Sequence, residues 1–125
     1  MPRSAYYEAN KVRLRAYRRA EHKLNRAAEN AKMRLRNTGF TAAMFSERLA
    51  TQRGHCAICE IKLITDTDRI EWRGRAVACA DHCHETGRQR GVLCRRCNTL
   101  LGYAGDAPDL LRRAIEYLER WRKKP

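Results

Sequence analysis

Two pairs of cysteines have the spacing of metal ligands. Cys56-Ala-Ile-Cys59 and Cys94-Arg-Arg-Cys97 are both C-x-x-C sequences, and 34 residues separate them. Each pair can bind Zn²⁺ through two thiolates, and the two pairs together complete a tetrahedral site without an open position. The alternatives are a redox C-x-x-C or buried thiols without metal, but a redox motif needs no second pair. We therefore predict one structural zinc ion, which stabilises the fold and does no catalysis.

The insertion between the cysteine pairs carries side chains suited to phosphodiester hydrolysis. It contains Asp81-His82-Cys83-His84, and Asn98 directly follows the last cysteine of the second pair. The carboxylate of Asp81 and the amide oxygen of Asn98 are hard ligands that suit Mg²⁺, which also keeps water and phosphate oxygens. An unperturbed imidazole is largely neutral near pH 7, so His82 suits a general base. The pattern predicts hydrolysis by one metal ion and one histidine.

Further side chains of the insertion are candidates for substrate contacts. We expect His84 to bind phosphate or to orient the substrate, and Arg88 or Arg90 to hold the phosphate backbone. Other interpretations stay open at this point. Either motif histidine could be a zinc ligand, and Asn98 could simply cap a helix.

Short elements must position these side chains. The sequence around and after the Asp-His motif predicts a strand, a turn, a strand and a helix, over residues 76–80, 85–88, 91–93 and 95–101. Asp81 and His82 then lie at the end of the first strand, where successive side chains point to opposite faces. Both can reach one phosphate only if the chain departs from regular strand geometry there.

The first 38 residues hold most of the positive charge. The 125 residues carry a formal net charge of +13, and residues 1–38 contribute +8 from 11 basic and 3 acidic residues. Good helix formers, with no glycine and with proline only at position 2, predict a helix over residues 4–36. A solvated or partly disordered arm is the alternative. We expect an arm that contacts DNA phosphates through Arg13, Arg15, Arg18, Arg19, Lys23 and Arg26.

Amphipathic helices are predicted on both sides of the insertion. After a break at Gly39, Thr41 can cap a helix over residues 42–52. Asp106 is the predicted N-cap of a final helix, which has Pro108 in its first turn and an apolar face that we expect to cover the core. The predicted organisation is a basic helical DNA-binding arm, a zinc-bound nuclease core and a C-terminal helix packed on that core, over residues 1–38, 39–105 and 106–125.

The composition excludes several classes of protein. The mean hydropathy is −0.74 and the sequence has no long apolar run, which excludes a membrane span. The sequence does not start with a secretory signal, so we expect a cytoplasmic protein. Six cysteines in that compartment favour metal binding over disulfides. Of the two cysteines outside the pairs, we expect Cys79 to be a small buried side chain and Cys83 a loop thiol.

These motifs resemble the phage recombination endonuclease VII family, which belongs to the HNH, or His-Me finger (ββα-metal), nucleases. The resemblance covers residues 41–102 and rests on the two cysteine pairs and on residues 81–87, 90–94 and 97–102. It implies that the paired cysteines bind zinc, that Asp81 and Asn98 bind a catalytic Mg²⁺ or its substitute Mn²⁺, and that His82 is the base. His84 corresponds to the second histidine of the motif. Phage or prophage origin, duplex or branched DNA as substrate and a homodimeric state are further implications.

Two positions depart from the family pattern. Cys83 stands where some members have an acidic residue between the histidines. Leu101 stands where the best-studied type of member has a glutamate, three residues after the asparagine. A metal or water contact made by that glutamate would be missing here.

The sequence thus predicts an α+β, mostly helical protein, with a zinc-stapled ββα core between a long basic helix and a C-terminal helix. The predicted function is Mg²⁺-dependent endonucleolytic cleavage of DNA, with branched or junction DNA as one candidate substrate. The alternative is a non-catalytic zinc protein that binds DNA as an accessory factor. The complete set of Asp81, His82 and Asn98 argues against that alternative, because binding alone does not require it.

Overall fold

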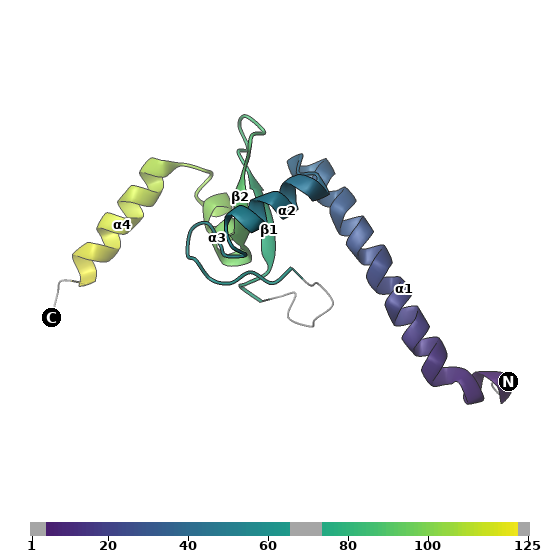
Figure 1. Ribbon diagram of the computed structural model, residues 1–125. Helices are drawn as coiled ribbons and strands as arrows, with labels where there is room; N and C mark the ends of the chain where they lie inside the picture. The colour runs from purple at the N-terminus through teal and green to yellow at the C-terminus, as the bar shows by residue number, and fades with distance from the viewer. Residues whose placement is uncertain (1–4, 66–73, 123–125) are drawn as a thin grey trace.

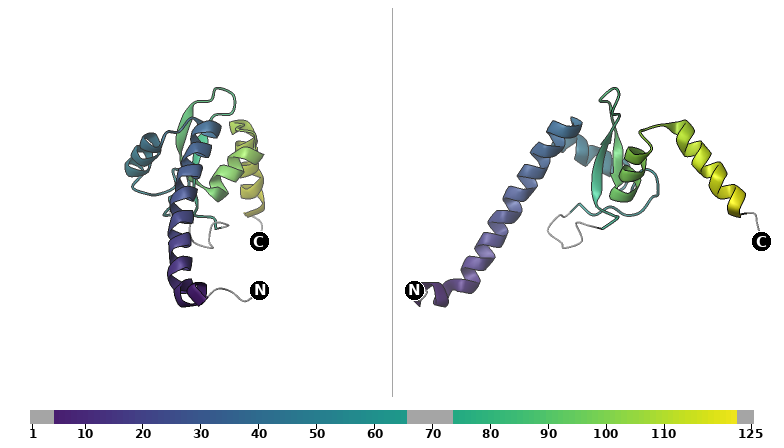
Figure 2. Two further views of the ribbon diagram at one scale, coloured as in Figure 1. Left: turned by 90° about the vertical axis from the view of Figure 1, so that its right-hand side faces the viewer. Right: turned by 180° about the vertical axis from the view of Figure 1, so that it is seen from behind.

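The computed structural model describes residues 5–65 and 74–122. Within these ranges the chain forms four helices and a two-stranded sheet, and the sheet lies at the centre with α2 and α3 (Figure 1). The long helix α1 and the final helix α4 extend away from this centre on opposite sides (Figure 2). No helix among the described residues is long and apolar enough to span a bilayer. The chain is therefore mostly helical around a small α+β core, as predicted.

The basic segment is one long helix, α1, which covers Ala5–Thr38. Ser4, where the sequence predicts its start, lies outside the described residues. The helix ends at Gly39, which has a φ of 75°, a left-handed conformation that glycine adopts without steric cost. A Cβ atom at Gly39 would also overlap Nε2 of Gln89, so the end of that flexible side chain would have to move. Phe40 follows directly and is fully buried.

The helix α2 spans Ala42–Thr51 and begins at the predicted cap. The hydroxyl of Thr41 accepts a hydrogen bond from the backbone N–H of Met44 at 3.1 Å, which satisfies one of the free donors of the first turn. Phe45 is the buried residue of this helix. The guanidinium of Arg34 lies 3.7 Å from the centre of the Phe45 ring, so the end of α1 packs against α2.

A side chain at the end of α2 connects this helix to the sheet. Nε2 of Gln52 donates to the carbonyl of Val92 at 2.8 Å, and Oε1 of Gln52 accepts from the N–H of Val92 at 2.9 Å. The amide thus pairs with the backbone of the second strand as another strand would. Gly91 permits this approach, because a Cβ atom there would lie 3.1 Å from Oε1 of Gln52.

The two strands are antiparallel; the first begins and ends two residues later than the sequence pattern suggests, and the second is longer at both ends. β1 covers Ala78–His82 and β2 covers Gln89–Cys94, whereas residues 76–80 and 91–93 are predicted. The first strand therefore runs through Asp81 and His82 instead of ending before them. Hydrogen bonding to the neighbouring strand, which single-sequence patterns do not reveal, determines these ends.

The strand pairing contains a β-bulge at the Asp-His motif. Ala80 pairs with Val92, but the next pair, His82 with Gln89, is shifted by one residue. Asp81 therefore lies opposite two residues of β2, which bends and twists the strands locally. The extra residue therefore belongs to β2, where Arg90 and Gly91 lie opposite Asp81.

The core is small and includes three of the paired cysteines. The helix α3, Arg95–Tyr103, follows β2 without a loop, packs against both strands and extends two residues beyond its predicted end. Its N-cap is Cys94, whose Sγ accepts from the N–H of Cys97. The buried apolar residues are Phe40, Phe45, Cys56, Leu63, Val92, Leu93, Cys94 and Cys97.

The C-terminal helix α4, Pro108–Arg122, does not cover the core. No residue of α4 is buried, and Leu110, Ile115 and Leu118 are each more than half exposed. The expected packing of this helix on residues 39–105 is therefore wrong for this structure. The amphipathic pattern predicts the helix correctly, but it does not specify which surface the apolar face meets.

Candidate active site and metal centre

The two cysteine pairs form one cluster of sulfur atoms. The Sγ atoms of Cys56, Cys59, Cys94 and Cys97 all lie within 4.8 Å of one another. The distance between Sγ of Cys59 and Sγ of Cys94 is 3.6 Å. Zinc–sulfur bonds of 2.3 Å in a tetrahedron separate the sulfurs by about 3.8 Å. The cluster therefore has the composition and dimensions of a structural zinc site.

The pKa values of these thiols are shifted from the ordinary value in opposite directions. Burial raises the pKa of Cys56, but hydrogen bonds from backbone N–H groups, that of Cys94 first, outweigh it and lower this pKa from 9.0 to about 6. Burial, together with the neighbouring thiols, raises the pKa of Cys97. Hydrogen bonds from backbone N–H groups thus favour the thiolate of Cys56, whereas burial and the neighbouring thiols oppose ionisation of Cys97. A thiolate ligand set of this kind suits Zn²⁺.

The Asp-His motif lies at the end of β1. Asp81 is buried, with 5 % of its surface exposed. Arg90 on β2 donates from Nε to Oδ2 of Asp81 at 2.6 Å and from Nη2 to Oδ1 at 2.9 Å. These hydrogen bonds raise the pKa of Arg90. The guanidinium therefore pairs with both oxygens of the predicted metal ligand, whereas the sequence predicts that Arg88 or Arg90 contacts the DNA backbone.

A second carboxylate, from Asp106, reaches the same guanidinium. Oδ1 of Asp106 accepts from Nη2 of Arg90 at 3.0 Å. Oδ2 lies 2.8 Å from Nδ1 of His84 and also accepts from the backbone N–H of His84 at 3.3 Å. These hydrogen bonds, that from His84 first and those from Arg90 next, lower the pKa of Asp106.

Sequence reasoning misses the role of Asp106. It predicts the N-cap of α4, but that helix begins at Pro108 and the carboxylate of Asp106 points to His84 and Arg90 instead. The contacts join residues 22 and 16 positions apart, and no local pattern signals them. The local sequence offers one weak sign, an acidic residue directly after Gly105, that the loop after α3 has an unusual conformation.

The two motif histidines lie close together. The ring centres of His82 and His84 are 4.7 Å apart, and His82 is half-buried whereas His84 is exposed. Asn98 is half-buried on the first turn of α3, which packs against β1. The strand that ends in the Asp-His motif thus contacts the helix that carries Asn98.

The donor set around Asp81 fits a divalent cation. Its carboxylate is buried, and the guanidinium of Arg90 donates to both of its oxygens. The structure therefore already accommodates a positive charge next to Asp81. Hard oxygen ligands from a carboxylate and an amide suit Mg²⁺. A metal ion at Asp81 would repel the guanidinium of Arg90, which pairs with both oxygens.

The remaining predicted residues lie at the surface. Arg88 is exposed next to the β1–β2 turn. Cys83 lies in the same turn, where hydrogen bonds to Thr86 lower its pKa. Cys79 is half-buried in β1, and burial raises the pKa of its thiol. Cys83 therefore has the position expected of a loop thiol, and Cys79 is only partly covered.

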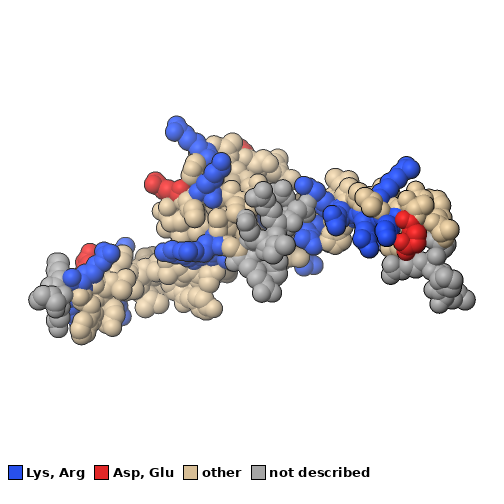
Figure 3. All heavy atoms as spheres, turned by 90° about the horizontal axis from the view of Figure 1, so that it is seen from below, with Lys and Arg blue, Asp and Glu red and all other residues tan. Residues whose placement is uncertain are grey.

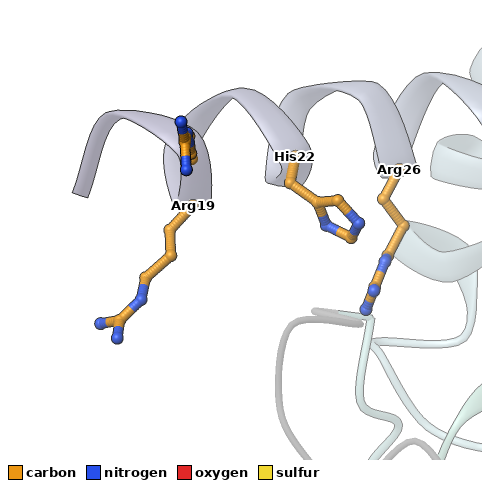
Figure 4. Close-up of a pocket in the computed structure, with 4 residues that line it drawn as sticks. Arg19, His22 and Arg26 are labelled. Carbon is orange, nitrogen blue, oxygen red and sulfur yellow. The ribbon is translucent and has the colours of Figure 1, made fainter. Parts of the chain in front are cut away.

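Basic side chains gather along the arm. All six predicted DNA-contacting residues of α1 are exposed, and blue basic side chains gather along α1 in Figure 3. Arg18, Arg19, His22 and Arg26 line an open pocket on one side of the helix. Figure 4 shows Arg19, His22 and Arg26 pointing to that side. Their spacing of three and four residues accounts for the shared face.

The antiparallel strand pair, the following helix and the clustered cysteine pairs define a ββα-metal unit with an Asp-His motif at the end of its first strand. The sequence profile of the recombination endonuclease VII family matches residues 31–120. The chain belongs to the recombination endonuclease VII family. This confirms the resemblance that the motifs suggest.

Individual relatives come from bacteriophages. The chain is 34% identical over 102 residues to the gene 59 protein of Mycobacterium phage D29, which covers 80% of this chain and 56% of that protein. It is 36% identical over 81 residues to the gene 59 protein of Mycobacterium phage L5, with 64% of this chain and 44% of that protein covered. The chain thus spans about half the length of the curated relatives that it matches.

A solved structure also resembles the chain. The crystal structure of the ββα-Me type II restriction endonuclease Hpy99I is 30% identical, with a TM-score of 0.44. The similarity covers 61% of this chain and 42% of that one.

Proposed function

We propose that this protein is a metal-dependent endodeoxyribonuclease that hydrolyses phosphodiester bonds in DNA. The observation that supports this most is the position of Asp81 and His82 at the end of β1, a strand that packs against α3, the helix that carries Asn98. Asp81 and Asn98 would hold the metal ion. When bound, Mg²⁺ would stabilise the negative charge that develops on the phosphate and on the leaving oxygen.

The histidines have separate roles in this proposal. His82 accepts the proton of the attacking water as general base, a role for which a half-buried imidazole at a strand end is suited. His84 contacts the substrate. Because Asp106 engages its Nδ1 atom, Nε2 of His84 remains for a phosphate oxygen or a bound water. Arg88, exposed next to the turn, is available to the DNA backbone.

The arm binds DNA by charge. Each phosphate that a lysine or arginine neutralises releases counterions and increases affinity without reading the sequence. The exposed basic residues of α1 and the core supply such contacts, so the shape of duplex or branched DNA would determine where the protein binds. The relatives are phage proteins, and the cytoplasm of a bacterial host is the proposed place of action.

The proposal includes a homodimer. On α4, Leu118, Tyr117 and Trp121 are each more than half exposed, and a second copy of the chain would cover this face. Light scattering of the purified protein should then give twice the mass of one chain. The variant Ile115→Asp/Leu118→Asp should be monomeric, and a monomeric wild type would contradict this part of the proposal.

Cleavage assays test the proposed activity directly. The zinc-loaded protein is incubated with plasmid and with four-way-junction DNA, with and without Mg²⁺. We expect cleavage only with Mg²⁺, and its loss in His82→Ala, because a general base contributes about 10²–10⁴-fold to the rate. His55→Ala, an exposed histidine outside the Asp-His motif, is the matched control and should cut like wild type. A wild type that shifts DNA but never cuts it, like His82→Ala, would instead favour the accessory DNA-binding protein.

A further inference from the structure

The guanidinium of Arg90 lies between two carboxylates. Its Nε and Nη2 atoms bind Asp81, and the same Nη2 atom also binds Asp106 at 3.0 Å. The side chain of Asp81 is 6% exposed, that of Asp106 15% and that of Arg90 33%. Arg90 is therefore the most accessible of the three side chains, and it has room to move towards solvent.

A metal ion and this guanidinium compete for Asp81. Both are cations, and both oxygens of Asp81 already accept hydrogen bonds from Arg90. A divalent ion at Asp81 would repel the positive charge of Arg90, so metal binding favours a position of the guanidinium farther from this carboxylate. Without a second partner, Arg90 would lose its charge-assisted hydrogen bonds on displacement, which opposes metal binding.

Asp106 is held in place independently of Arg90. Its backbone N–H donates to the carbonyl of Leu101 at 3.1 Å, and its carboxylate is fixed by two contacts to His84. Its φ of 55° follows the left-handed Gly105 and directs the loop after α3 back towards the sheet. The acceptor therefore stays in place when the guanidinium moves.

We propose that Asp106 is a positioning residue for metal loading, which retains Arg90 when the guanidinium leaves Asp81 to a divalent cation. The inference rests on the proposed function, since it requires a metal ion at Asp81. In this arrangement Arg90 neutralises the buried carboxylate in the metal-free protein and stays bound to Asp106 when the metal ion takes its place at Asp81. Asp106 acts on the metal through Arg90 and is not itself a ligand.

Binding of Mn²⁺ to the zinc-loaded, DNA-free protein tests this directly, with free Mn²⁺ measured by electron paramagnetic resonance. Asp106→Asn should weaken Mn²⁺ binding by up to about tenfold, or about 1.4 kcal/mol, because Arg90 already binds Asp106 in the metal-free protein and only the strengthening of this contact on metal binding counts. Arg90→Gln should strengthen it, because the competing cation is gone. The double variant Asp106→Asn/Arg90→Gln should match Arg90→Gln within about twofold, because Asp106 has no guanidinium left to hold.

Two controls make the comparison specific. Asparagine adopts a positive φ readily, so Asp106→Asn should retain the fold, which zinc content and circular dichroism verify. Glu85→Gln removes an equal charge from the exposed β1–β2 turn and should leave Mn²⁺ affinity unchanged. This separates the effect of the Asp106–Arg90 hydrogen bond from the general removal of a negative charge.

Each other outcome has a definite meaning. Unchanged Mn²⁺ affinity in Asp106→Asn overturns the retention of Arg90 by Asp106. An equal loss of affinity from Asp106→Asn in the Arg90→Gln background overturns it too, because Asp106 would then be a direct ligand. Asp81→Asn binding Mn²⁺ as tightly as wild type would reject the metal site of the proposed function itself, a failure distinct from the first two.

Discussion

Arg90 donates two hydrogen bonds to the buried carboxylate of Asp81, from Nε at 2.6 Å and from Nη2 at 2.9 Å. The pair lies at the β-bulge, where Asp81 has two residues of β2 opposite it. Bidentate guanidinium–carboxylate pairs fix geometry as well as charge. In the metal-free protein this pair therefore stabilises the bulge that holds the Asp-His motif.

Removal of the Arg90 guanidinium should destabilise the metal-free protein. Arg90→Met leaves the buried carboxylate of Asp81 without its partner, which costs about 1–3 kcal/mol in the free energy of unfolding. Urea unfolding of the zinc-loaded protein without other divalent ions measures this change. Arg88→Met, at an exposed position on the same segment, should change stability by less than about 0.5 kcal/mol. Equal effects of the two substitutions would argue against a structural role for the Arg90–Asp81 pair.

Loss of one zinc ligand should unfold the core. Cys94 is 1% exposed, ends β2 and caps α3, and the zinc-binding free energy of small domains is largely folding free energy. Cys94→Ser should therefore contain far less than one zinc per chain by metal analysis and lose its cooperative thermal transition. Cys79→Ser is the matched control, because Cys79 lies outside the sulfur cluster. Full zinc content in Cys94→Ser would contradict the assignment.

Zinc retention should depend on pH through the thiolates. The pKa of Cys56 is lowered from 9.0 to about 6 in the folded chain. Stabilisation from a lowered pKa is complete above the ordinary value, decreases as the pH falls and is lost below the folded value. Bound zinc competes with protons, so the midpoint of zinc release to a chromophoric chelator should lie at or below pH 6. A midpoint above pH 7 in wild type, or one shifted by Cys79→Ser, would contradict this.

Sequence reasoning succeeds where the chemistry is local. The C-x-x-C spacing predicts that Cys56 and Cys59 share a site with the second pair, and the cluster dimensions agree. The N-cap at Thr41 and the break at Gly39 are likewise correct, because each depends on neighbouring backbone groups. Local hydrogen bonds and steric limits leave few alternatives at such positions.

It fails where a residue's partner is distant in the chain. Asp106 has the residue type of an N-cap, but its carboxylate meets His84 and Arg90 across the loop after α3. Gln52 ends a helix in the sequence pattern, whereas in the structure its amide pairs with β2. The apolar face of α4 predicts burial, yet the structure leaves it exposed. Tertiary packing determines all three.

The arm should contribute salt-dependent affinity for DNA. Arg15, Arg19 and Arg26 recur at spacings of four and seven residues, so they share one face of α1. Their replacement by glutamine retains helix propensity and should reduce the slope of log K against log salt by about 0.9 for each phosphate that the arm no longer neutralises, up to about 2.7. Fluorescence anisotropy with duplex DNA, in the His82→Ala background without Mg²⁺, measures binding without cleavage.

A second triple variant distinguishes local binding by the arm from net charge. Arg112→Gln, Arg113→Gln and Arg120→Gln remove the same charge from α4, on the opposite side of the core (Figure 1). If α1 binds the phosphates, this control should keep most of the wild-type slope, because only distant charges have changed and these are screened at about 10 Å in 0.1 M salt. Equal slopes for the two triple variants would mean that overall charge, and not the arm, accounts for the binding.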